Sequence, residues 1–207
     1  RNGEAVAGIY AAKGRPSFNP LIVHLPDIET AKRYVEWTDD ADRLAQAFWP
    51  GALTLVLPLK PDSGLSSLVT AGLPSLAVRV PAHPAMRQVL QALDGPVAAP
   101  SANPSGKISA TTAAHVLAGL DGKIAAVLDD GACTVGLEST ILGLTGPRPA
   151  LLRAGGLPSE AIEAALGQPL EIVDGAEIIA PGQLASHYAP GAAGGPTTPS
   201  GPPAHFS

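Results

Sequence analysis

The sequence alternates short apolar runs with segments whose apolar residues follow helical spacing, and this alternation constrains the fold more than any other feature. Short runs rich in Val, Leu and Ile are typical of buried strands, whereas a period near 3.6 residues is typical of amphipathic helices. Strands that alternate with helices build a layered α/β domain in which helices flank the sheet. We expect strands at residues 21–25, 53–59, 76–80, 97–99, 125–128, 139–144 and 151–153.

The helices fall between these runs, and capping residues indicate where they begin and end. We expect a C-terminal cap at Gly14, N-terminal caps at Asp39 or Asp40 and at Thr111 or Thr112, and further helices at 84–93 and 158–166. In the helix at 84–93, spacing predicts that Leu93 faces the core.

Composition excludes several classes of protein. The chain has 207 residues, of which 45% are hydrophobic and 15% charged, enough for a sizeable core. No apolar run reaches the roughly 18 residues of a membrane span, and no signal peptide opens the sequence, so we expect a cytoplasmic protein without membrane contact. The net charge of −5 argues against broad electrostatic capture of nucleic acid.

The single cysteine, Cys133, excludes an internal disulfide. No Cys/His cluster has metal-ligand spacing, so we identify no metal site built from protein side chains. We expect Cys133 to be buried, as free cysteines commonly are.

Charged and polar residues at the ends of predicted strands indicate a nucleotide site. Lys13 and Arg15 stand one residue apart where a helix gives way to a strand. Arg79 lies inside an apolar strand, where burial without an anionic partner is costly, so we expect it to face a site. Ser101 and Asn103 follow another predicted strand and can offer hydroxyl, amide and backbone donors to a phosphate.

The order of the motifs resembles the threonylcarbamoyl-AMP synthase family, the YrdC/Sua5 group, over roughly residues 1–190. The resemblance rests on Lys13-x-Arg15-Pro16, Asn19-Pro20-Leu21 with His24, Pro50-Gly51-Ala52-Leu53-Thr54, Arg79-Val80-Pro81, Pro100-Ser101-Ala102-Asn103, Ser105-Gly106, Ser139-Thr140-Ile141, Arg153-Ala154-Gly155 and Ser186-His187-Tyr188-Ala189-Pro190. It implies a YrdC-like twisted mixed sheet flanked by helices, with an extended C-terminal linker and tail.

The resemblance also implies an activity. L-Threonine, bicarbonate and ATP, with Mg²⁺ bound through ATP oxygens, would give threonylcarbamoyl-AMP and pyrophosphate. The product would pass to the tRNA threonylcarbamoyl transferase complex, which makes N6-threonylcarbamoyladenosine at tRNA position 37.

Residue roles follow from the same resemblance. The implied catalytic residues are Lys13, Arg15, Ser101 and Asn103. The implied ATP contacts are Lys13, Arg15, Asn19, Ser75, Ser101, Asn103, Ser109, Arg153 and Tyr188. The implied L-threonine contacts are His24, Arg79, the backbone at Ala99 and Ser139.

Three segments are expected along the chain. Residues 1–174 would form the catalytic domain without the family's first strand, 175–193 a Sua5-type linker that lies over the site, and 194–207 a disordered Gly/Pro-rich tail.

Two other readings remain open. A catalytically impaired YrdC-like module could retain contact with double-stranded RNA or tRNA, which a salt-dependent affinity would reveal. Carbamoyl transfer in hydrogenase maturation uses a related domain, but it also needs acylphosphatase and zinc-finger regions that this sequence lacks.

Overall fold

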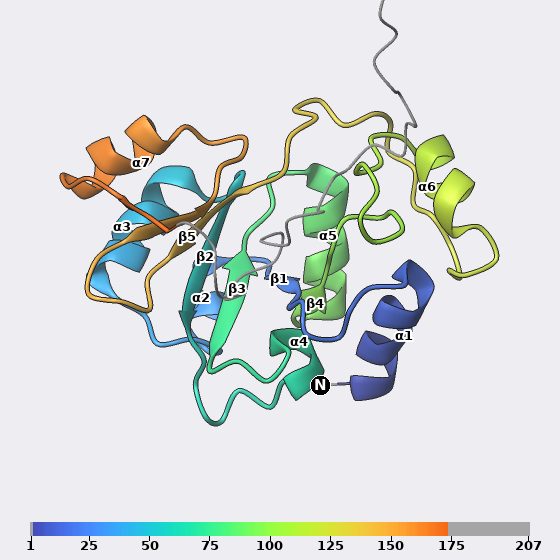
Figure 1. The fold of residues 1–207 in the computed structure, drawn as a ribbon, viewed down its shortest axis with the longest axis horizontal. Helices are drawn as coiled ribbons and strands as arrows, with labels where there is room; N and C mark the ends of the chain where they lie inside the picture. Colours follow the sequence, from blue (N-terminus) through green and yellow to red (C-terminus); the bar gives the residue numbers. More distant parts are fainter. Residues whose placement is uncertain (1, 174–207) are drawn as a thin grey trace, which may run out of the picture.

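The computed structural model describes residues 2–173, and within them one seven-stranded mixed sheet has the order β4-β1-β3-β2-β5-β6-β7 (Figure 1). The strands are β1 (Ile22–His24), β2 (Leu53–Pro58), β3 (Ser75–Arg79), β4 (Val97–Ala98), β5 (Thr140–Gly143), β6 (Ala150–Arg153) and β7 (Glu171–Ile172). The helices are α1 (Gly3–Lys13), α2 (Ile28–Ala31), α3 (Asp39–Phe48), α4 (Ser67–Thr70), α5 (Pro84–Leu93), α6 (Ala113–Leu120) and α7 (Ser159–Leu166).

Parallel and antiparallel pairs alternate across this sheet. Strand β1 runs parallel to β3, β2 to β5 and β6 to β7, whereas β2–β3, β5–β6 and β1–β4 are antiparallel. The expected mixed α/β sheet flanked by helices is confirmed.

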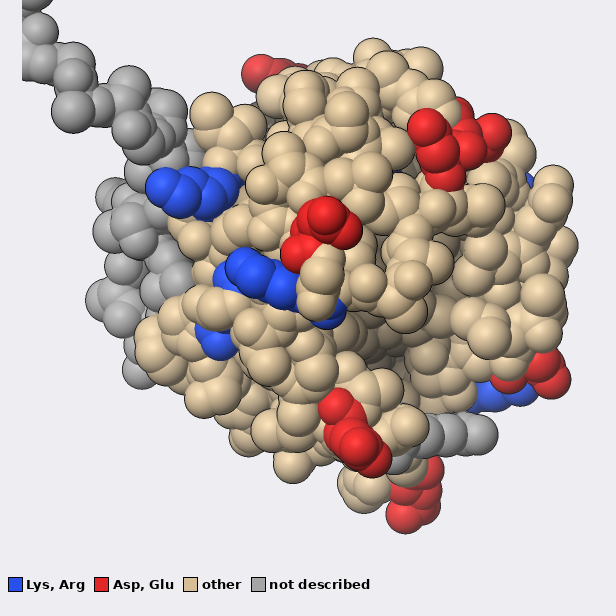
Figure 2. Space-filling view, turned by 90° about the vertical axis from the view of Figure 1, so that its right-hand side faces the viewer, with Lys and Arg blue, Asp and Glu red and all other residues tan. Residues whose placement is uncertain are grey.

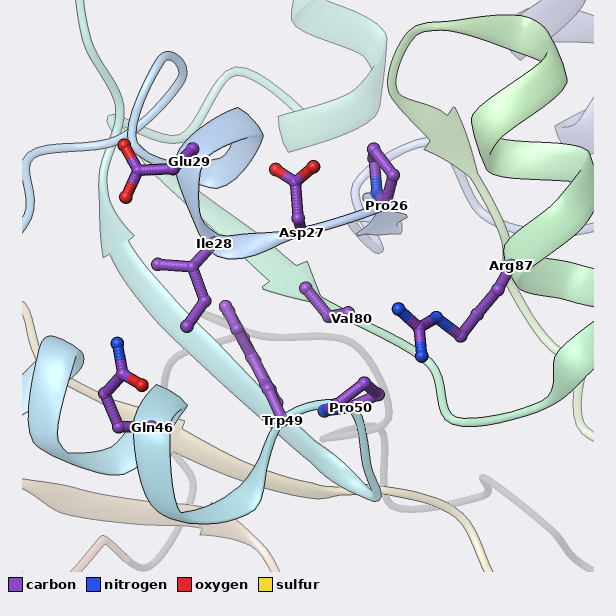
Figure 3. Close-up of a pocket in the computed structure, with 9 residues that line it drawn as sticks. All are labelled: Pro26, Asp27, Ile28, Glu29, Gln46, Trp49, Pro50, Val80 and Arg87. Carbon is purple, nitrogen blue, oxygen red and sulfur yellow. The ribbon is translucent and has the colours of Figure 1, made fainter.

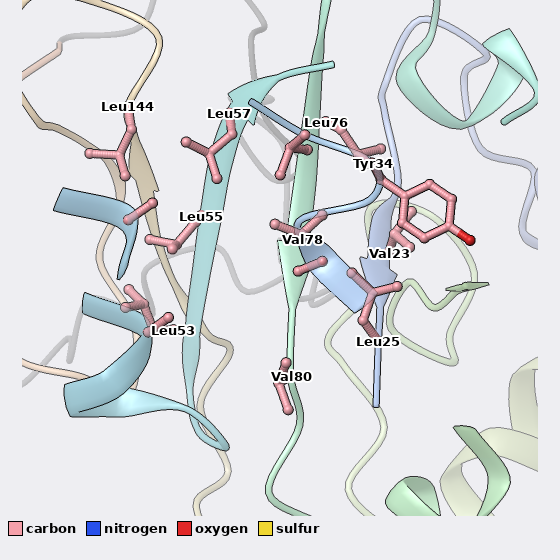
Figure 4. Close-up of a cluster of buried hydrophobic side chains, with 14 of the residues drawn as sticks. Val23, Leu25, Tyr34, Leu53, Leu55, Leu57, Leu76, Val78, Val80 and Leu144 are labelled. Atoms are coloured by element: carbon pink, nitrogen blue, oxygen red, sulfur yellow. The ribbon is translucent and has the colours of Figure 1, made fainter. Parts of the chain in front are cut away.

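One face of the sheet is apolar and packed against helices. Alternate residues of β2 point to this face, and Leu53, Leu55 and Leu57 are completely buried there (Figure 4). Helices α3 and α7 cover them with Leu44 and Ile162, and these two helices also contact each other. Full burial of each leucine stabilises the fold by about 1.5–3 kcal/mol, so this layer is the main core.

The opposite face holds a small apolar patch and then turns polar. Its apolar part consists of Ile22, Val56, Ala77, Ile141 and Leu152. Because side chains alternate along a strand, the residue two positions after Ile22 and the residue two after Ala77 share this face. Those residues are His24 and Arg79, at the carboxyl ends of adjacent parallel strands. The fold thus places polar side chains on the face that the large core does not use.

Four local expectations are wrong. Thr38, not Asp39 or Asp40, caps α3, because its hydroxyl accepts a hydrogen bond from the Ala41 amide at 3.2 Å. Both aspartates lie in the first helical turn, where a negative charge is favoured.

The other errors concern surface segments. Residues 125–128 form no strand, and Leu128 is 73% exposed. Leu93, the last residue of α5, is also exposed, because the inward stripe of that helix ends with the fully buried Leu90. Cys133 is exposed rather than buried. Within residues 2–173, no helix is long and apolar enough to cross a bilayer.

Candidate active site

The end of α1 joins two segments that are far apart in the sequence. Gly14 adopts a left-handed conformation (φ 58°) that ends the helix and turns the chain. Lys13, in the last turn, is buried, and its Nζ donates hydrogen bonds to the backbone carbonyls of Ser101 and Asn103. The amide of Ser105 in turn donates to the Lys13 carbonyl at 2.8 Å. The predicted Lys-x-Arg and Ser-x-Asn motifs therefore lie side by side.

Burial weakens the proton affinity of Lys13. Desolvation is the larger cause and the positive charge of Arg15 the second, and together they lower the pKa of Lys13 to about 8. Glu138 opposes this change, so an acidic side chain lies close enough to influence the amine. Lys13 can therefore lose its charge near the upper end of physiological pH.

Arg15 organises the turn that leads into β1. Its Nε donates to the Asn19 carbonyl at 3.1 Å, and its Nη2 donates to Asn19 Oδ1 at 2.8 Å and to the Pro20 carbonyl at 2.6 Å. The Asn19 side chain is fully buried, and its Nδ2 has no hydrogen-bond partner among the described residues. Buried amides are usually bonded, so this nitrogen marks a place where a ligand or water is expected to bind.

Asn103 shows the same incomplete pairing. Its Nδ2 donates to the Lys107 carbonyl at 2.8 Å, while its buried Oδ1 lacks a hydrogen-bond partner within residues 2–173. The two asparagines therefore both keep an unused polar atom in the neighbourhood of Lys13 and Arg15.

The carboxyl ends of β1 and β3 bring His24 and Arg79 together, since these residues are register partners. Arg79 Nε donates to the Gly51 carbonyl at 2.8 Å, which holds the guanidinium against the turn before β2. Burial lowers the pKa of Arg79, Glu138 raises it, and Arg153 lowers it further. Burial and then Arg79 lower the pKa of His24 to about 3, so the imidazole is neutral near pH 7.

The start of β5 carries a network of hydroxyls that ends at Arg153. Ser139 Oγ lies 2.8 Å from Thr54 Oγ1, and both residues are buried. Arg153 donates to the Ser139 carbonyl through Nε at 3.1 Å and Nη2 at 2.8 Å, and to Ser139 Oγ at 3.2 Å. At Gly155 a Cβ would approach the Glu138 carbonyl to 2.4 Å, so glycine is needed for this close packing.

Glu138 interacts with several of the basic residues, and it was not among the site residues predicted from the sequence. Ser109 Oγ donates to Glu138 Oε1 at 2.5 Å, and Arg153 Nη2 lies 3.9 Å from Glu138 Oε2. The same carboxylate influences Lys13 and Arg79. Lys13, Arg79 and Arg153 therefore all lie within the electrostatic reach of one carboxylate. Figure 2 shows one face of the molecule, on which basic side chains lie next to an acidic one at the edge of a hollow.

Thr54 was not among the predicted site residues, although it lies in a quoted motif and its hydroxyl contacts Ser139. The sequence signal for Thr54 was a single hydroxyl residue inside an apolar strand. Thr54 is two residues from Val56, so it lies on the same face of the sheet as the smaller apolar patch. For Glu138 the signal was weaker, a single acid directly before Ser139.

Two cavities lie near these residues. One of about 420 Å³ runs between α1, α6 and the segment after β4, and Lys13, Ala99 and Ser101 line part of it. The other, of about 340 Å³, is lined by Trp49, Pro50 and Arg87 with six further residues, none of which was a predicted site residue (Figure 3).

The remaining predicted site residues are not shown to contact the cations described above. The Ala99 amide donates to the Ile22 carbonyl at 2.9 Å, which puts it beside the first residue of β1, whereas the register partner of His24 is Val97. Ser75 begins β3 whereas Arg79 ends it, so their Cα atoms are separated by about 13 Å along the strand. Tyr188 lies outside the described residues, as does the whole expected linker and tail after residue 174.

Known relatives share this sequence and fold. The chain is 48% identical to the threonylcarbamoyl-AMP synthase of Bacillus subtilis (strain 168), covering 92% of this chain and 56% of that protein. It is 44% identical to the enzyme of the same name from Pyrococcus abyssi, with 91% and 56% coverage. The chain thus spans about half the length of these curated relatives.

Solved structures of related proteins have the same fold as this chain. The crystal structure of P. abyssi Sua5 complexed with L-threonine matches with a TM-score of 0.85 and 43% identity, covering 91% of this chain and 57% of that one. Escherichia coli YciO has a TM-score of 0.67 over 75% of each chain at 18% identity, which shows the shared fold alone. A family model described as "Sua5_yciO_yrdC: Telomere recombination" matches residues 1–155. The chain belongs to the Sua5/YciO/YrdC family.

Proposed function

We propose that this chain is a nucleotidyltransferase that forms threonylcarbamoyl-AMP and pyrophosphate from L-threonine, bicarbonate and ATP. The observation that carries the proposal is the convergence of Lys13, Arg79 and Arg153 around one carboxylate, beside the Ser101–Asn103 turn. A triphosphate and an amino-acid carboxylate together require several cations in one place. The names of the B. subtilis and P. abyssi relatives support this assignment.

The reaction needs no protein nucleophile. The amino group of threonine and bicarbonate give a carbamate with loss of water, a carbamate oxygen attacks the α-phosphorus of ATP, and the α–β bridging oxygen leaves with pyrophosphate. The protein contributes position and charge neutralisation, which dominate in phosphoryl and nucleotidyl transfer.

The nucleotide side of the site would use the two joined motifs. We assign Lys13, Arg15 and Arg153 to the phosphates and the Ser101 hydroxyl to a phosphate oxygen, close to the reacting α-phosphorus. Asn103 is assigned to a ribose hydroxyl of the nucleotide, because its unpaired Oδ1 can only accept a hydrogen bond. Further nucleotide contacts are proposed at Asn19, Ser75, Ser109 and Tyr188.

The threonine side would use the carboxyl ends of β1 and β3. Arg79 suits the carboxylate because a guanidinium can bind both oxygens at once. His24, neutral near pH 7, can accept or donate one hydrogen bond to the substrate without adding charge. Ser139 and the Ala99 backbone are assigned to the remaining polar groups of threonine.

Mg²⁺ is proposed to arrive on the ATP oxygens. Among residues 2–173, no group of three or more His, Cys, Asp or Glu side chains is placed to hold a metal ion. Mg²⁺ is a hard ion that commonly binds through phosphate oxygens and water, with few protein ligands. Bound to ATP in this way, it would share the neutralisation of the phosphate charge with Lys13 and Arg15. The product is proposed to pass, in the cytoplasm, to the tRNA threonylcarbamoyl transferase complex.

Pyrophosphate release tests the proposal directly. We expect release to require threonine and bicarbonate together, and release that is unchanged when threonine is omitted would refute the assignment. Arg79→Gln should raise the KM for threonine about 10- to 150-fold, because a charge-assisted hydrogen bond contributes about 1.5–3 kcal/mol. Arg148→Gln removes an exposed guanidinium that pairs with Glu171 at 3.9 Å, and it should leave the kinetics unchanged.

A further inference from the structure

We propose that Glu138 is a positioning residue: an internal counter-ion that holds Arg153 and Ser109 in place among the surrounding cations. The inference rests on the proposed function, since it concerns the same nucleotide site. No expectation from the sequence assigned a role to this side chain.

The contacts of Glu138 fix its place in the site. Its carbonyl accepts a hydrogen bond from the Gly156 amide at 2.8 Å, which ties its backbone to the turn after β6. Its two carboxylate oxygens face different partners, Oε1 the Ser109 hydroxyl at 2.5 Å and Oε2 the Arg153 guanidinium at 3.9 Å. The side chain thus connects the loop that carries Ser109 to the end of β6.

The surrounding charges explain why an acid stands here. The positive charge of Arg153 lowers the pKa of Arg79, and that of Arg15 lowers the pKa of Lys13. Glu138 opposes both effects, because its negative charge favours the protonated forms of Lys13 and Arg79. Without it, like charges would repel and the side chain of Arg153 would lose a partner that orients it.

A carboxylate in a phosphate site also repels the ligand. Its net effect on ATP affinity is therefore small or unfavourable, and its benefit must lie in how it arranges the cations. Kinetics can therefore distinguish the two roles. If Glu138 positions the cations, loss of its charge should lower kcat without raising the KM for ATP, whereas loss of an ATP-binding residue would raise that KM.

Substitution of Glu138 by Gln removes the charge and keeps an oxygen for Ser109. We expect Glu138→Gln to lower kcat about tenfold or more while the KM for ATP stays equal or falls. The alkaline limb of kcat/KM, which reports the free enzyme, should move to lower pH because Lys13 loses its proton more easily. Glu138→Asp, which restores the charge, should return the limb toward its original position.

Glu171→Gln is the matched control, since Glu171 also lies 3.9 Å from an arginine, Arg148, but on the surface away from the site. It should change neither kcat nor the pH limb. An unmoved alkaline limb in Glu138→Gln, or a raised KM for ATP with unchanged kcat, would overturn the positioning role.

The inference can fail separately from the proposed function. If the unsubstituted chain shows no threonine-dependent pyrophosphate release, the function fails, and the pKa of Lys13 can still be followed by NMR of ¹³C-labelled lysine. Glu138→Gln should lower that pKa below its value in the unsubstituted chain, and an unchanged value would refute the inference. Near-ultraviolet circular dichroism confirms in either case that the variant is folded.

Discussion

His24 makes stability depend on pH at the scale of a single residue. Its folded-state pKa is about 3, whereas an unfolded histidine titrates near 6.5, so the unfolded chain binds more protons as the pH falls. The stabilisation is therefore complete above about pH 6.5 and is lost as the pH falls toward 3. Between pH 6.5 and 5 we expect a loss of about 2 kcal/mol from this group, measured by urea unfolding. His24→Gln should flatten this slope, whereas His115→Gln, at an exposed helix position, should leave it unchanged.

The sequence predicted the cations of the site better than their partners. Lys13, Ser101 and Asn103 were expected together because the resemblance to the family pairs the Lys-x-Arg and Ser-x-Asn motifs, and they do lie in contact. Glu138 was not anticipated, because its meaning comes only from contacts with Ser109 and Arg153, which no local pattern encodes. Ion pairs between residues far apart in the sequence depend on the tertiary structure, so the spacing of residues along the chain does not predict them.

At the scale of an element, β2 contributes buried side chains to the core, whereas the segment at 125–128 lies on the surface. Leu55 in β2 is completely buried, so Leu55→Ala should lower the free energy of unfolding by about 2–5 kcal/mol, partly through the cavity it leaves. Leu128→Ala removes the same atoms from a side chain that is 73% exposed, and its effect should stay within about 0.5 kcal/mol. Equal losses in urea titrations of the two variants would contradict this division.

The same contrast explains which elements the sequence revealed. Long helices and the buried strands β2, β3 and β5 were expected, because several residues share one periodic pattern. The short elements α2, α4 and β7 were not expected, because their residues form neither a distinct apolar run nor a repeated helical spacing. An apolar run such as 125–128 looks like a strand, yet becomes one only where a neighbouring strand has unpaired backbone groups to offer.

For the whole molecule, the distribution of charge opposes a role in nucleic-acid binding. The net charge is −5, and Lys13 and Arg15 are buried in the site instead of forming an open basic face. Nonspecific RNA affinity comes from lysines and arginines that displace counterions from phosphates, and it falls steeply with salt. We expect fluorescence anisotropy to detect no micromolar binding of a short RNA duplex at 50 mM salt. A measurable affinity whose logarithm falls linearly with log salt concentration would instead support the RNA-binding module, with the slope giving the number of phosphates contacted.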